Sequence, residues 1–164
     1  MRNNRNWVAF FILIALLLSS AGGCVQPGFT TYTNDEQGYS ISYPMNWEEE
    51  ISADSAIYII TSPSHFGSVR VDVIDPMPAQ QVAQRWIMAM GTGSEDFALL
   101  ENKQMEGFWQ WYVSYDYEAE MGRYKGEAYF KTTGDHTYKV DTAADLGGYT
   151  NYPFSTIVSS FKVK

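Results

Sequence analysis

Short runs in which apolar and polar side chains alternate constrain the fold of this chain more than any other feature. Residues 39–43 form one such run, and their alternation indicates a β-strand with one buried face. Its inward positions are Tyr39, Ile41 and Tyr43. Pro44 has no N–H with which to extend a ladder, so the strand ends there, and Trp47 brings a large ring back toward the same core.

The same period of two recurs further along the chain. Residues 67–75 place three valines on one face of a second strand, and residues 108–119 predict the longest strand. The rings and the valine expected on the inner face of that longest strand are Trp109, Trp111, Val113, Tyr115 and Tyr117. Shorter strands are predicted at 31–33, 56–61 and 97–105, so the pattern as a whole favours an antiparallel sheet.

Two hairpins follow the longest strand. A register that sets large rings against small partners places Tyr115 opposite Ala128 in the first hairpin. In the second, a three-residue loop at 133–135 places Phe130 opposite Tyr138. Both registers are expectations that depend on one face of the sheet being apolar.

Two segments change to the helical period. Residues 79–90 and the segment that begins at Pro153 carry apolar side chains spaced for one face of a helix. The apolar positions are Val82, Ala83, Trp86, Ile87 and Met90 in the first, and Phe154, Ile157, Val158 and Phe161 in the second. Strands, a helix, a meander and a last helix together predict an α+β fold, with a central antiparallel sheet flanked by helices in an α-β-α sandwich.

The N-terminus has a different character. Arg2 and Arg5 precede an uninterrupted apolar run at residues 7–18, and small residues then lead to Cys24. A run of this length is shorter than the roughly 20 residues of a membrane-spanning helix, and it suits the core of a signal peptide. Residues 1–23 are therefore expected to be a leader, 24–31 a tether and 32–164 one folded domain.

Cys24 is the only cysteine, so no disulfide can form within the chain. Small residues directly before a cysteine, after an apolar run, resemble the lipobox of bacterial lipoproteins. That resemblance implies cleavage before Cys24 and its acylation, which would anchor the domain to a membrane. Cleavage after Ala21 and an uncleaved leader remain the alternatives.

The charge of the chain limits its partners. Removing residues 1–23 takes two of the 11 basic side chains and none of the 19 acidic ones, so the net charge of −8 becomes −10. A surface this acidic argues against DNA or RNA as a partner and against a basic patch that would adhere to anionic lipid. Solubility is its simplest consequence, and cation binding is the other.

Several of these motifs resemble a known family. The segments 32–34 and 38–44, followed by Trp47, look like the opening of PsbP-type domains, and residues 157–161 are similar to the end of their last helix. The resemblance implies the sheet-and-helix arrangement shared by PsbP-like and Mog-type Ran-binding proteins. It also implies one of two settings, because PsbP members assist photosystem II on its lumenal side, whereas similar domains occur in non-photosynthetic bacteria and archaea.

Residues capable of catalysis or metal binding are few. His65 and His136 lie in different predicted loops without metal-ligand spacing, and no nucleophile elbow or phosphate loop is present. The best acidic cluster is predicted on and across the first hairpin, as weak candidate ligands for Ca²⁺: Asp116, Glu118, Glu120 and Glu127. The aromatic face of the longest strand could stack on sugars, but its alternation with polar residues favours a core.

These observations predict a non-enzymatic lipoprotein without a cofactor, held in the cell envelope on the extracytoplasmic side by acylated Cys24 and binding a protein partner. The alternative prediction is an accessory or assembly factor of the oxygen-evolving complex of photosystem II, with weak calcium binding.

Overall fold

A computed structural model describes residues 28–51, 57–60, 67–94 and 96–164. The leader, His65 and the first half of the tether, including Cys24, lie outside the described residues. Within these ranges the elements follow in the order β1 (Phe29–Asn34), β2 (Tyr39–Pro44), β3 (Glu48–Ile51), β4 (Ile57–Ile60), β5 (Gly67–Ile74), α2 (Ala79–Gly93), β6 (Ala98–Gln104), β7 (Trp111–Ala119), β8 (Gly122–Thr132), β9 (Thr137–Asp145), the short 3-10 helix η1 (Tyr149–Asn151), α3 (Phe154–Ser160) and β10 (Lys162–Val163).

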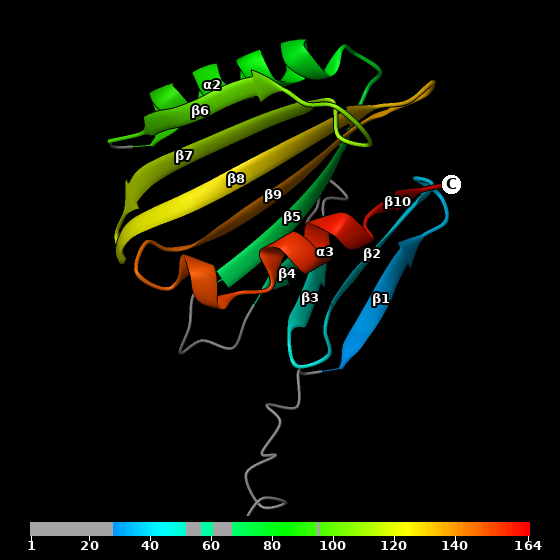
Figure 1. Cartoon of the computed structure of the whole chain (residues 1–164), viewed down its shortest axis with the longest axis horizontal. Coiled ribbons are helices and arrows are strands. Elements are labelled where there is room, and N and C mark those ends of the chain that lie inside the picture. Colours follow the sequence, from blue (N-terminus) through cyan, green and yellow to red (C-terminus); the bar gives the residue numbers. More distant parts are fainter. Residues whose placement is uncertain (1–27, 52–56, 61–66, 95) are drawn as a thin grey trace, which may run out of the picture.

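The strands form two antiparallel sheets. A seven-stranded sheet has the order β3-β4-β5-β9-β8-β7-β6, and a small sheet has the order β1-β2-β10. Helix α2 packs on β6, β7 and β8, while α3 packs on β2. Figure 1 shows α2 and α3 on opposite sides of the large sheet. The predicted α+β fold, an antiparallel sheet flanked by helices, is therefore confirmed.

Both faces of the large sheet are covered, so there are two apolar cores. One core lies on the side of α3 and the small sheet, and it contains the predicted inward residues of β2 and β5: Tyr39, Ile41, Tyr43, Val69 and Val71. The other core lies under α2 and contains Val82, Ala83, Val113, Tyr115 and Phe130. No helix among the described residues is both long and apolar enough to cross a bilayer.

The prediction for the longest strand was wrong in two respects. Strand β7 begins at Trp111, and β8, with 11 residues, is longer. Trp109 precedes the strand and belongs to the α3 core, where its ring centroid lies 5.3 Å from that of Phe161, while Val113 and Tyr115 lie under α2. Because apolar layers cover both faces, an aromatic residue before the strand could enter either core.

Each predicted hairpin register was also wrong. In the first hairpin Ala119 pairs with Gly122, so Tyr115 lies opposite Gly126 and not Ala128. A Cβ atom at Gly126 would lie 2.2 Å from the Tyr115 ring, so the ring fits only over a residue without a side chain. This close packing of a ring on glycine determines the register.

In the second hairpin Thr132 pairs with Thr137, which places Phe130 opposite Lys139 and leaves four residues in the loop. The hydroxyls of both threonines donate to the carbonyl of Met77, at 2.7 and 2.6 Å. These bonds tie the hairpin end to the segment before α2. The predicted register assumed that the inner face is wholly apolar, whereas the face under α2 carries the buried Lys139.

Candidate functional site

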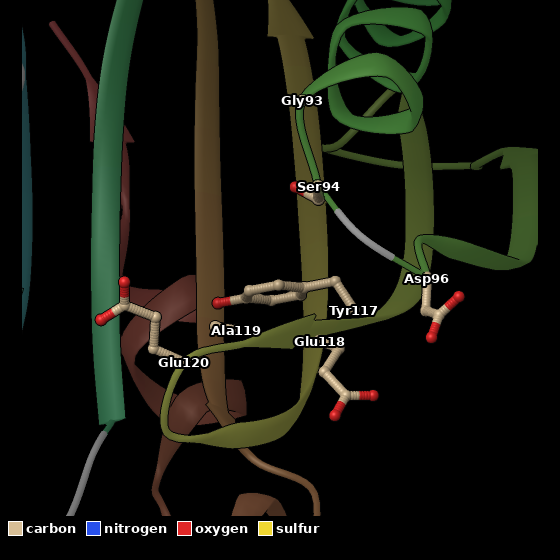
Figure 2. Close-up of a pocket in the computed structure, with 7 residues that line it drawn as sticks. All are labelled: Gly93, Ser94, Asp96, Tyr117, Glu118, Ala119 and Glu120. Atoms are coloured by element: carbon tan, nitrogen blue, oxygen red, sulfur yellow. The ribbon is translucent and has the colours of Figure 1, made fainter.

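An acid-lined pocket lies where the C-terminal end of α2 meets the β7–β8 hairpin (Figure 2). Its volume is about 640 Å³, and it is lined by Gly93 and Ser94, by Asp96, and by the segment Tyr117–Glu120. The helix ends here because Ser94 is the C-cap and its backbone is extended, while its N–H still donates to the carbonyl of Met90. We call this hollow the hairpin pocket.

The hairpin pocket has a negative electrostatic character. Three of its lining residues are acidic, Asp96, Glu118 and Glu120, and none of its lining residues is basic. The last carbonyls of α2 add the partial negative charge of a helix C-terminus. Its chemistry therefore suits a cation, such as the side chain of a lysine or arginine.

Tyr117 provides the aromatic wall of the hairpin pocket. Its ring stacks between those of Tyr115 and Tyr124, with centroids 5.9 and 5.4 Å away. Burial, with the nearby Asp141 charge, raises the pKa of Tyr117 to about 12, so the phenol stays neutral at physiological pH. Its neutral ring therefore adds no charge of its own to the acidic lining.

The predicted calcium ligands are divided by the hairpin geometry. Glu118 and Glu120 line the hairpin pocket, and their carboxylates point away from each other in Figure 2. Asp116 lies 3.9 Å from the guanidinium of Arg123, and Glu127 lies 3.6 Å from the ammonium of Lys125. Among the residues that the structure describes, no group of three or more His, Cys, Asp and Glu side chains could hold a metal ion.

A buried charged cluster beneath α2 was missed by sequence reasoning. The Lys139 ammonium lies 2.6 Å from a carboxylate oxygen of Asp72 and 3.8 Å from one of Asp141, and Tyr115 donates its hydroxyl to Asp141 at 2.7 Å. Lys139 also lies 5.3 Å from the centre of the Trp86 ring. Burial raises the pKa of Asp141, and the charge of Lys139 opposes that rise.

The cluster forms because β5 and β9 are neighbours, with Asp72 directly opposite Lys139. Its signal in the sequence is an acid and a lysine at positions that alternate with core residues on two strands. The sequence does not show that β5 and β9 pair, so it could not predict that the acid and the lysine meet. The ring stack of Tyr115 and Tyr117 connects this cluster to the hairpin pocket.

The aromatic residues of the predicted stacking platform are divided between the two cores. Trp109 and Tyr115 are 8% and 2% exposed, which confirms that both belong to the interior. A second hollow of about 510 Å³ lies beside Trp109, between Phe108 and the end of α3. It is lined mainly by apolar side chains and has no carboxylate among its lining residues.

Comparison with known proteins defines the class of fold. No protein-family model matches this sequence, and no curated protein matches it significantly. Solved structures do match, and they show that the chain has a PsbP/Mog1-like fold.

Three of these structures are informative. The solution structure of cyanobacterial PsbP (CyanoP) from Synechocystis is 19% identical, with a TM-score of 0.60 over 90% of this chain and 99% of its own. The Saccharomyces cerevisiae Ran-binding protein Mog1p is 10% identical, with a TM-score of 0.58 over 84% and 96%. LpqN, involved in cell envelope biogenesis of Mycobacterium tuberculosis, is 11% identical, with a TM-score of 0.57 over 84% and 91%.

Proposed function

We propose that this chain is a membrane-anchored, extracytoplasmic binding domain that recognises a protein partner and catalyses no reaction. The observation that carries the proposal is the lipobox-like sequence at Cys24, four residues before Gly28, the first described residue of a PsbP/Mog1-like fold. A Ran-binding protein and a protein involved in cell envelope biogenesis share this fold, which supports a protein partner and is consistent with a role at the envelope.

The hairpin pocket is the surface we assign to the partner. Its acidic lining residues favour a partner surface that carries a basic side chain, and Met121 beside it is 79% exposed. An exposed apolar side chain next to an acidic hollow is the combination that interfaces use, with an apolar contact and a charge that sets orientation. The partner is therefore expected to present a lysine or an arginine next to an apolar residue.

Anchoring is tested by Cys24→Ser. Without the thiol no acyl chain can be attached, so most of the variant should leave the membrane pellet and appear in the soluble fraction. Fractionation followed by immunoblotting measures the shift. A variant that pellets with membranes as the unchanged protein does would contradict anchoring through Cys24.

Partner binding is tested by charge reversal in the hairpin pocket. In-cell crosslinking with the full-length protein, followed by quantitative mass spectrometry, identifies bound proteins. Glu120→Lys places a cation where the partner's cation should bind, and it should reduce capture of the main partner at least tenfold. Glu106→Lys is the matched control, because Glu106 is exposed on the β6–β7 connection and is not a lining residue of the pocket.

Capture that is unchanged in Glu120→Lys, or reduced equally in Glu106→Lys, would contradict this assignment. The same experiment addresses the second candidate, an accessory role at photosystem II, which the match to CyanoP over nearly the whole of both chains favours. In that case the captured partner would be a photosystem II subunit.

A further inference from the structure

Strand β6 forms one edge of the seven-stranded sheet. It pairs with β7 on its inner side, and no described strand pairs with its outer side. Six of its seven residues are exposed, from Leu99 to Gln104. An open edge of this kind is a template for pairing with another chain.

The backbone groups of this edge are arranged for pairing. Met105 donates its N–H to the carbonyl of Gln110 at 3.1 Å, so the peptide groups of Met105 face β7. Because antiparallel strands alternate in direction, those of Lys103 and Glu101 also face β7, and those of Asn102 and Gln104 face outward. No described strand bonds these outward N–H and C=O groups, and the alternation holds from Glu101 onward, after the β-bulge between Leu99 and Glu101.

The charges along β6 are complementary between two copies. Within one copy Lys103 already donates to Glu101 at 2.7 Å. In an antiparallel pair of two copies centred on Asn102, each Glu101 also lies opposite the other copy's Lys103, twice by symmetry. Those positions would be the non-hydrogen-bonded pairs, in which side chains approach most closely. Lysine on an edge strand usually discourages pairing, but in this register it meets a carboxylate.

The opposite edge of the sheet, strand β3, does not carry complementary charges. Strand β3 carries Glu48, Glu49 and Glu50, all exposed. Two copies paired through β3 would bring like charges together, and so would β3 of one copy against the glutamate of β6. Charge therefore selects β6 with β6 among the pairings that these two edges allow.

Two exposed apolar side chains lie on the edge strand itself. Leu99 and Leu100 of β6 are 44% and 55% exposed. Helix α2 runs alongside β6 in Figure 1 and packs against it. A second copy paired at β6 would bring its own α2 and leucines to this surface.

We propose that two copies of this chain associate through antiparallel pairing of their β6 strands, with Asn102 on the two-fold axis, to form one continuous sheet. The association goes beyond the proposed function and requires neither the hairpin pocket nor Cys24. It leaves the hairpin pocket outside the shared edge strand, one in each copy.

The test is a disulfide at the axis in the full-length protein in its native membranes. Residues in a hydrogen-bonded antiparallel pair have Cα atoms about 5.5 Å apart, within the range of a disulfide. Asn102→Cys should therefore form covalent dimers under mild oxidation. Met121→Cys is the control, because Met121 is also exposed but lies on the β7–β8 turn, and it should form at least fivefold less covalent dimer. The unchanged chain, whose only cysteine is Cys24, should form no covalent dimer.

Charge exchange then tests the register. In the Asn102→Cys background, Glu101→Lys or Lys103→Glu alone places like charges opposite each other twice and should reduce the dimer at least fivefold. The double exchange restores opposite charges and should restore the dimer. Failure of restoration, equal crosslinking through Met121→Cys, or a disulfide to a different protein would overturn self-pairing.

A second measurement does not depend on Asn102→Cys, which removes the acceptor of the Trp111 indole N–H. Stepwise photobleaching of a C-terminal fluorescent label on the otherwise unchanged chain, in the same membranes, should show mainly two-step traces. Single-step traces throughout would overturn the proposal.

Discussion

Lys139→Ala should destabilise the folded domain by about 3 kcal/mol, because it removes the cation from a buried ion cluster. The Lys139 side chain is 8% exposed and lies between Asp72 and Asp141. Without it, Asp141 keeps the Tyr115 hydroxyl but loses its nearest positive charge. Asp72 keeps Arg70, at 2.5 Å, which holds the cost at the lower end of the usual range for a broken buried pair.

Chemical denaturation followed by tryptophan fluorescence measures the change in the free energy of unfolding. Lys125→Ala is the matched control, since Lys125 lies on the neighbouring strand with its side chain 32% exposed and 3.6 Å from Glu127. Its loss should cost less than about 1 kcal/mol. If the two variants were equally stable, the cluster beneath α2 would not contribute as its burial indicates.

Trp109→Ala should cost about 3–5 kcal/mol, the range for removing a large ring from a packed core. The indole contacts rings from three parts of the chain, with centroids 5.1 Å from Phe108, 5.7 Å from Tyr129 and 5.3 Å from Phe161. Its removal would therefore loosen the contact between the large sheet and the segment after α3. Phe108→Ala, at a neighbouring ring that is 45% exposed, should cost only about 1 kcal/mol.

Thermal and denaturant unfolding of both variants provide the comparison. A loss below 1 kcal/mol for Trp109→Ala would mean that the ring does not support the α3 core. It would then have to be considered as part of the hollow that it lines with Phe108.

Local patterns predicted the elements well. The alternation at 39–43 identified β2 and its inward face, since a strand with one buried side repeats every two residues. The apolar spacing of 79–90 identified α2, whose observed end lies three residues later at Gly93. The strand β3 was not predicted, because its three consecutive glutamates show no alternation.

Registers and sites depended on contacts between distant residues. Gly126 is an ordinary glycine in the sequence and becomes the support of the Tyr115 ring only when β7 and β8 pair. Glu118 and Glu120 were predicted as parts of an acidic cluster, but Asp96, which lies more than twenty residues earlier, joins them only at the end of α2. A pattern of neighbouring residues cannot predict contacts between residues so far apart in the sequence.

The amino-acid sequence by itself determined the two main helices, the strands whose side chains alternate and the acidic character of the domain, and it predicted an anchor at Cys24. Periodicity, charge and short motifs are properties of neighbouring residues. The tertiary structure alone decided which face of the sheet each ring occupies, where Lys139 finds its carboxylates, and which strand is left at the edge. These are decided by the pairing of strands far apart in the chain, where a glycine beneath a ring or a buried ion pair outweighs the local preference of either strand.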